Sequence, residues 1–79
     1  MEKYKIEIKK SAVKEITKLP PKDLQKILKE IEFLADNPRP FGAIKLSADD
    51  KYRLRVDNYR ILYQIFDYKL IVIVVKIGH

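Results

Sequence analysis

Apolar and polar positions alternate at the start of the chain and then change to helical spacing. In residues 4–9, tyrosine and isoleucine alternate with lysine and glutamate, the period-two pattern of a strand with one buried face. Ser11 is then placed to cap a short helix, which Pro20 and Pro21 end. The apolar residues of this helix recur at helical spacing, and they are Val13, Ile16 and Leu19. The chain is therefore predicted to begin with a strand and a short amphipathic helix.

A second, longer helix is predicted to begin at Pro21, because proline at a first-turn position loses no helical hydrogen bond. A single apolar stripe with spacings of three and four residues runs along it. The stripe consists of Leu24, Ile27, Leu28, Ile31, Leu34 and Ala35. It ends at Asn37-Pro38, so we expect the two helices to form an αα-hairpin that buries one face.

The second half of the chain reads as a loop followed by three strands. Residues 37–50 contain two prolines and a glycine, which predicts a loop with a brief apolar contact through Ile44 and Leu46. Three β-prone runs follow, separated by Asp57-Asn58 and by residues 67–69, which are short enough for hairpin connections. The runs cover residues 52–56, 59–66 and 70–77. The predicted fold is α+β in one domain, ordered β-α-α-β-β-β, with the helical hairpin packed on one face of a small, mostly antiparallel sheet.

A two-residue turn at Asp57-Asn58 sorts the side chains of its two strands into two faces. One face, which we expect to lie under the helices, carries Tyr52, Leu54, Val56, Tyr59, Ile61 and Tyr63. The other carries Arg53, Arg55 and Arg60, with Arg55 directly opposite Arg60. Like charges in that position destabilise a strand pair by a few tenths of a kcal/mol, which favours an anion bound between the arginines. Arginine suits this role because its planar guanidinium forks onto phosphate oxygens.

The arginine cluster is also compatible with two arrangements that need no bound anion. Asp49, Asp50 or Asp57 can neutralise it, or a longer turn can shift the register. A different alternative is a generic RNA-binding domain, which would expose aromatic residues beside the charges so that bases can stack on them. Tyr68, in a predicted turn, is the tyrosine that we expect to be accessible.

Composition narrows the class of protein. The 17 lysine and arginine residues against 11 aspartate and glutamate residues give a net charge of +6, which suits a polyanionic partner or an ordinary lysine-rich surface. With no cysteine and one histidine, we expect no disulfide, no metal site and no cofactor. The apolar runs are too short to span a bilayer and the start is unlike a signal peptide, which favours a cytoplasmic protein without membrane contact. Four helical lysines are further candidates for contact with a polyanion: Lys10, Lys14, Lys18 and Lys22.

Several stretches of the sequence, taken in order, resemble the RelE branch of the RelE/ParE superfamily, the toxins of bacterial and archaeal toxin-antitoxin pairs. "YKIEIKKSAVKEITKLP" is similar to the family's first strand and helix, and "LADNPRPFGAIKL" to its helix end and the loop that follows. "YRLRVDNYRILYQI" resembles the family's most recognisable stretch, and "VVKIGH" resembles its final strand. The likeness covers nearly the whole chain.

The resemblance implies an mRNA endoribonuclease that acts in the ribosomal A site, where the 2′-hydroxyl of a nucleotide attacks its own 3′ phosphate. Arg53, Arg55 and Arg60 fall on the family's basic catalytic positions, which implies that Arg55 and Arg60 clamp the phosphate. The base stays unassigned, because arginine with a pKa above about 12 does not lose its proton. Residues expected to assist binding are Lys45, Lys51 and His79. The expected partners are a cognate antitoxin, the ribosome and mRNA.

The likeness also implies an arginine and a tyrosine after Gly78-His79. The 79-residue chain is therefore expected to lack the family's usual C-terminal tail and to cleave weakly or not at all. For His79, the alternative to a binding role is a disordered end with no role. Two alternative functions stay open. One is a ParE-like inhibitor of DNA gyrase that cuts no RNA, and the other is a non-enzymatic module whose basic face binds an antitoxin.

Overall fold

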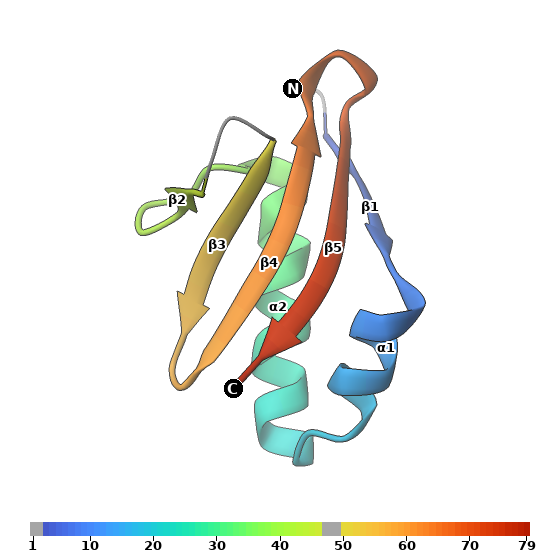
Figure 1. Ribbon diagram of the computed structural model, residues 1–79, viewed down its shortest axis with the longest axis vertical. Coiled ribbons are helices and arrows are strands. Elements are labelled where there is room, and N and C mark those ends of the chain that lie inside the picture. Colours follow the sequence, from blue (N-terminus) through green and yellow to red (C-terminus); the bar gives the residue numbers. More distant parts are fainter. Residues whose placement is uncertain (1–2, 47–49) are drawn as a thin grey trace.

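The described residues form two layers, a five-stranded sheet and two helices that cover one face of it (Figure 1). The computed structural model describes residues 3–46 and 50–79. The strands are β1 (Lys5–Ile8), β2 (Ile44–Lys45), β3 (Lys51–Val56), β4 (Tyr59–Phe66) and β5 (Ile71–Gly78). The helices are α1 (Lys10–Thr17) and α2 (Pro21–Asp36), and a short 3-10 helix, Asp67–Lys69, joins β4 to β5. The predicted order of elements is confirmed, and β2 is an addition to it.

The sheet has the order β1-β5-β4-β3-β2, so the first and last strands of the chain lie side by side. β1 runs parallel to β5, and the other strand pairs are antiparallel, which confirms a mostly antiparallel sheet. Figure 1 shows the helices on the far side of this sheet, while its near face stays open. Among the described residues, no helix is both long and apolar enough to cross a membrane.

The core is one apolar layer between the helices and the sheet. The helices bury Ala12, Ile16, Ile27, Ile31 and Leu34. The strands bury Tyr52, Leu54, Val56, Ile61, Tyr63, Ile65, Val72, Val74 and Ile77. Burial alternates along β3 and β4, as the period-two pattern predicts. Since a chain of this length buries a limited share of its surface, this single layer supplies most of the apolar burial.

α1 differs from its prediction in both its cap and its apolar face. The helix begins one residue before Ser11, and no side chain caps it. The Ser11 hydroxyl instead donates a hydrogen bond to the backbone carbonyl of Val75 in β5, at 3.2 Å. Val13 is 44% exposed, whereas Ala12 and Ile16, one turn apart, are buried. The helix is therefore rotated about its axis relative to the predicted stripe, and the small Ala12 lets it lie close to the sheet.

α2 follows its prediction closely. It begins at Pro21 and ends at Asp36. Ile27, Ile31 and Leu34 face the sheet and are buried, while Leu28, on the flank of the predicted stripe, is 38% exposed. A long helix with a continuous stripe is well specified by the spacing of its apolar residues.

The loop between α2 and β3 does not pack as predicted. Ile44 and Leu46, the expected apolar contact, are 50% and 43% exposed, so this prediction is wrong. Ala43 packs against the core instead. Ile44 belongs to the edge strand β2 and pairs with Arg53 of β3. Paired residues point to the same face of a sheet, so the Ile44 side chain lies on the face that the helices leave open.

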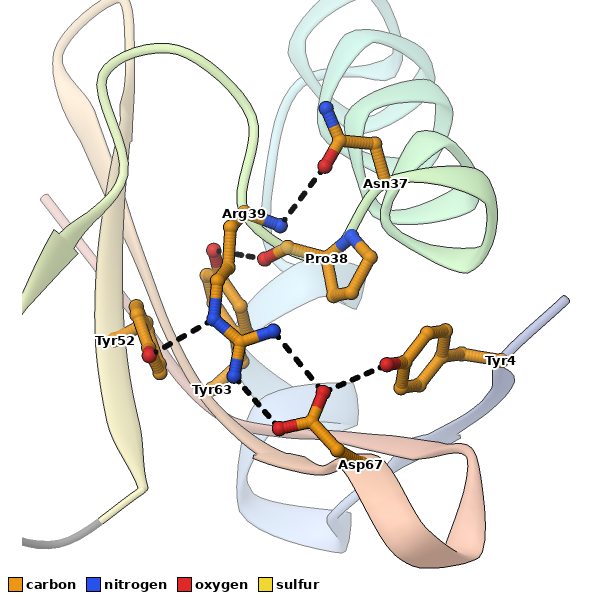
Figure 2. A network of polar contacts seen from close by, with 7 residues as sticks. All are labelled: Tyr4, Asn37, Pro38, Arg39, Tyr52, Tyr63 and Asp67. Carbon is orange, nitrogen blue, oxygen red and sulfur yellow. Dashed lines mark hydrogen bonds and ion pairs between the residues drawn. The ribbon is translucent and has the colours of Figure 1, made fainter.

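The same loop is held by polar contacts around Arg39, which we call the Arg39–Asp67 clasp (Figure 2). The Arg39 guanidinium donates to both carboxylate oxygens of Asp67, at 3.0 and 2.8 Å, and to the Tyr52 hydroxyl, at 3.0 Å. The Tyr4 hydroxyl donates to the same carboxylate at 2.6 Å. These four residues join the chain start, the loop after α2, strand β3 and the turn after β4.

Behind the clasp, Tyr63 carries the contact into the core. Its ring stacks on that of Tyr52, with 5.9 Å between the ring centroids, and its hydroxyl donates to the Pro38 carbonyl at 2.8 Å. Burial raises the pKa of Tyr63 to about 12, so the hydroxyl stays a neutral donor. In the clasp itself, hydrogen bonds from Arg39 and Tyr4 hold the pKa of Asp67 at about 2.

We expect Asp67→Asn to lower the free energy of unfolding by about 1 kcal/mol at neutral pH, because it removes a bidentate ionic contact with Arg39. The expected effect is small because both side chains are about half exposed, so solvent screens their attraction. The pKa of Asp67 is about 2 in the folded protein against an ordinary 3.8. The carboxylate therefore stabilises the fold above pH 3.8, and this contribution is lost as the pH falls through about 2. Urea unfolding of both proteins across this range measures the difference.

The control for this experiment is Asp36→Asn. Asp36 and Lys3 form an exposed ion pair at 3.6 Å, so its loss should change the unfolding free energy very little. If Asp67→Asn differed from the parent by the same amount at every pH, the stabilisation would not come from the ionised Asp67 carboxylate.

Candidate functional site

The β3–β4 hairpin places three arginines on the open face of the sheet. Arg55 pairs with Arg60 across the two-residue turn, as the sequence predicted. Asp57 has a positive φ of 53°, the left-handed conformation that such a turn requires. Arg53 is half-buried, while Arg55 and Arg60 are exposed. The alternative with a longer turn and a shifted register is therefore wrong.

A shallow hollow of about 280 Å³ lies on this face, and we call it the arginine hollow. It is lined by Leu46, Arg53, Arg60, Leu62, Lys76, Gly78 and His79. Leu62 of β4 pairs with Arg53 on one side and with Lys76 on the other, so an apolar side chain lies between cations from both neighbouring strands. None of the described lining residues has a carboxylate side chain. Arg55 lies on the same face next to the hollow but does not line it.

Lys76 reaches the hollow through a β-bulge in β5, and the sequence pattern alone did not identify it. Val74 and Lys76 pair with successive residues of β4, so Val75 is an extra residue between them. In an uninterrupted strand, Lys76 would share the helix-covered face with Val74. The bulge reverses the alternation, so Ile77 is buried and Lys76 faces the arginines. The sequence does contain a signal for the bulge. Lys76 stands two residues after Val74, where the alternation of buried residues predicts another apolar side chain.

Two side chains of α1 hold the bulge from behind. The Ser11 hydroxyl donates to the Val75 carbonyl, and the backbone N–H of Ile77 donates to the Glu15 carboxylate at 3.3 Å. A bulge disrupts the regular ladder of backbone hydrogen bonds, and these two contacts satisfy polar groups on either side of it. The position of Lys76 therefore depends on the contact between α1 and β5.

The remaining residues predicted to assist binding lie in three different places. Lys45 pairs with Tyr52, so its side chain belongs to the opposite face from the arginines. Lys51 pairs with Gln64 and lies on the arginine face, but outside the hollow. His79 lines the hollow. The structure thus brings His79 to the arginines and separates Lys45 from them.

His79 is packed against a tyrosine, which disfavours the alternative of a disordered end. The centroids of the His79 and Tyr59 rings are 5.1 Å apart, and the rings are tilted by 49°. The Tyr59 hydroxyl donates to the Asp23 carboxylate of α2 at 2.7 Å, and this hydrogen bond raises the pKa of Tyr59. A chain of contacts therefore runs from α2 to the last residue of the sequence.

Carboxylates do not neutralise the arginine cluster in the part of the chain that the structure describes. Asp57 forms an ion pair with Lys26 of α2, at 2.8 Å, and so turns toward the helices. Asp50 makes no ion pair with a described residue. Asp49, the third carboxylate considered, lies outside the described residues. The arginine face therefore keeps a positive charge that suits an anionic ligand.

Most tyrosines serve the core, as predicted. Tyr52 and Tyr63 are buried, Tyr59 is half-buried, and Tyr68 is 81% exposed. Phe41 is fully exposed in the loop after α2, which the sequence pattern did not predict. Neither Phe41 nor Tyr68 lines the arginine hollow, so the hollow offers charge and not a stacking platform of the kind that single-strand binders use.

Comparison with known proteins identifies the family. A family model described as "ParE toxin of type II toxin-antitoxin system, parDE" matches residues 6–79. The chain belongs to this family. A candidate RelE1 toxin of Methanocaldococcus jannaschii is 35% identical to this toxin over 80 residues, which cover 96% of this chain and 89% of the relative. A RelE-like toxin protein of Escherichia coli is 32% identical over 78 residues, which cover 96% of this chain and 82% of the relative.

Solved structures share the fold of this toxin. A chain of the toxin-antitoxin complex RelBE2 from Mycobacterium tuberculosis has a TM-score of 0.85 and 24% identity, with 98% of both chains covered. A chain of the intact E. coli RelBE complex has a TM-score of 0.83 and 26% identity, with 95% of this chain and 94% of that chain covered. The predicted RelE-like fold is confirmed.

The lining of the toxin's arginine hollow has the chemistry that an anionic group such as a phosphodiester requires. Guanidinium groups keep their charge and match the geometry of two phosphate oxygens, while the Lys76 ammonium adds a point charge from the facing strand. Cations held in place before the reaction stabilise negative charge that grows on phosphate oxygens. The hollow therefore suits electrostatic stabilisation.

Gly78 offers a direct test of the charge in the hollow. It lies opposite Arg60, and a Cβ added there meets no atom within 4 Å, so a larger side chain fits without strain. We expect Gly78→Glu to weaken binding of single-stranded RNA by about 1 kcal/mol, or several-fold, because it places a carboxylate among the cations. Gly78→Gln adds the same volume without charge and should bind nearly as the parent does. Fluorescence anisotropy at low salt measures both, and equal binding by the two variants would mean that the hollow does not hold the phosphates.

Proposed function

We propose that this toxin is a ribosome-dependent endoribonuclease of the cytoplasm that cleaves mRNA in the A site. The observation that carries the proposal is the arginine hollow, in which Arg53 and Lys76 flank Leu62, Arg60 adds a third cation, and no described lining residue has a carboxylate side chain. A phosphodiester gathers additional negative charge as it is attacked, and fixed cations stabilise that charge more in the transition state than in the ground state.

In the proposed reaction, the 2′-oxygen of a nucleotide attacks its own 3′ phosphorus, and the 5′-oxygen of the next nucleotide leaves. The attacking hydroxyl gives up one proton and the leaving oxygen takes one up, which yields a 2′,3′-cyclic phosphate and a 5′-hydroxyl. Arg55 and Arg60 clamp the phosphate, while Arg53 and Lys76 stabilise the charge on its oxygens. No base is assigned among these residues, because guanidinium groups do not lose their protons. Lys51 extends the binding surface on the same face, and His79 borders the hollow from the edge beside Tyr59.

The proposed partner is a cognate antitoxin that covers part of the basic face with an acidic or amphipathic segment. This is supported by the net charge of +6 and by the toxin-antitoxin complexes in which similar chains have been solved. A covered arginine hollow would be closed to mRNA, so the antitoxin would hold the toxin inactive.

We expect Arg53→Gln and Arg60→Gln each to slow mRNA cleavage on programmed ribosomes by a factor of about 10² or more, since each removes a cation from the developing charge. Lys29→Gln, which removes an exposed cation of α2 outside the hollow, is the matched control and should cleave as the parent does. Thermal melting of all variants separates a lost charge from a lost fold. Sequencing of the mRNA breaks locates the cleaved bonds.

The same preparations distinguish the alternative target. DNA supercoiling by gyrase should proceed unchanged in the presence of the toxin. Inhibition of gyrase without mRNA breaks would overturn the nuclease proposal and assign the toxin to the gyrase-directed class.

Antitoxin binding should weaken as salt rises, because long-range attraction to the basic face is screened. Calorimetric titration with the cognate antitoxin at low and at high salt measures the change in affinity. The variant Arg60→Gln should show a smaller change in affinity between the two salt concentrations. If affinity were the same at both salt concentrations, apolar packing would account for the complex and the electrostatic mode would be rejected.

A further inference from the structure

A second hollow lies between α1 and β5, beside the arginine hollow. It measures about 490 Å³ and is lined by Ser11, Lys14, Glu15, Lys18, Val75 and Lys76. Lys76 lines both hollows, so the two surfaces meet at this residue. The β-bulge at Val75 is what creates the meeting point, since it turns Lys76 outward at the position where α1 lies against β5.

The second hollow is positively charged. Lys14 and Lys18 are exposed and lie one helical turn apart, a spacing at which like charges repel by a few tenths of a kcal/mol. Glu15 is the one carboxylate among the described lining residues, and it accepts the Ile77 backbone N–H at 3.3 Å. Among the described residues, neither lysine forms an ion pair. Lys14 and Lys18 therefore lie side by side on one face of α1, and neither is paired with a described carboxylate.

The chemistry of the lining indicates which part of a nucleic acid it suits. From α1 and its C-cap the hollow is lined by two lysines, a serine and Glu15, with no aromatic ring on which a base can stack. Lysine ammonium groups contact phosphates as point charges and do not read sequence from such a position. Cβ atoms one helical turn apart are about 5–6 Å apart, so Lys14 and Lys18 place two positive charges next to each other along the helix.

We propose that the backbone of a single-stranded RNA leaves the arginine hollow, crosses β5 at Lys76 and continues along α1 over Lys14 and Lys18. The second hollow then serves as a phosphate track that adds affinity without sequence preference. This inference rests on the proposed function of the arginine hollow for its starting point. It extends that function to a surface on the helix layer of the molecule, where the sequence pattern indicated the lysines only as candidates for contact with a polyanion.

The test uses a long single-stranded oligonucleotide with 2′-O-methyl groups, which binds without being cleaved. The variant Lys14→Gln/Lys18→Gln removes the two charges and keeps good helix formers. The matched control, Lys29→Gln/Lys69→Gln, removes two exposed charges outside both hollows. For single strands, each phosphate contact contributes about 0.7 to the slope of the logarithm of the binding constant against the logarithm of salt. We therefore expect the track variant to lower that slope by about 0.7 for each lysine and the control to leave it nearly unchanged.

A dinucleotide that occupies one hollow at a time supplies a second comparison. The track variant should bind the dinucleotide like the parent, whereas Arg60→Gln should weaken both the dinucleotide and the long oligonucleotide. If the track variant matched the control on the long oligonucleotide while Arg60→Gln weakened it, the track would be rejected and the proposed function would stand. If Arg60→Gln had no effect while the track variant did, RNA would still bind along α1, but the proposed role of the arginine hollow would fail.

An acidic protein segment is a second polyanion that lysines on α1 can attract. The same variants are therefore titrated with the cognate antitoxin. Loss of antitoxin binding together with an unchanged RNA salt slope would overturn the RNA track and assign the second hollow to the antitoxin.

Discussion

The β-bulge of β5 is the constraint on which both faces of the sheet depend. One extra residue, Val75, lets Val74 and Ile77 both point into the core, while Lys76 points out beside Arg53. The bulge is tied to α1 by the Ser11 hydroxyl and the Glu15 carboxylate. The same contact between helix and strand thus completes the apolar layer, supplies the third cation of the arginine hollow and adjoins the second hollow along α1.

The core residues and the cluster of cations lie on opposite faces of this small sheet. The helix-covered face carries the apolar residues, and among the described residues no polar or charged residue is fully buried there. The open face brings Arg55 opposite Arg60 and surrounds Leu62 with cations, an arrangement that costs stability in the absence of an anion. The Arg39–Asp67 clasp offsets such a cost at the other end of the sheet, where it ties the chain start, a loop and a turn to β3.

The separation also explains how a toxin of this family can keep one scaffold while presenting a basic surface. Under the proposed function, a phosphate chain or an acidic antitoxin segment bound at this face would remove the repulsion between the arginines and would gain affinity from it. That gain is electrostatic and depends on salt, because the open face is exposed to solvent. The apolar layer beneath it is complete without a ligand, so folding and binding are separable.

Much of this architecture follows from the sequence alone. The stripe of α2, the alternation of β3 and β4 and the turn at Asp57-Asn58 are local patterns, so the α+β order, the register and the arginine face could be predicted. Tertiary structure decided the rest. The bulge at Val75, the rotation of α1, the exposure of Ile44 and the clasp between Arg39 and Asp67 all depend on contacts between segments distant in the chain. No local periodicity encodes such contacts, because each is set by how the layers pack once the strands have paired.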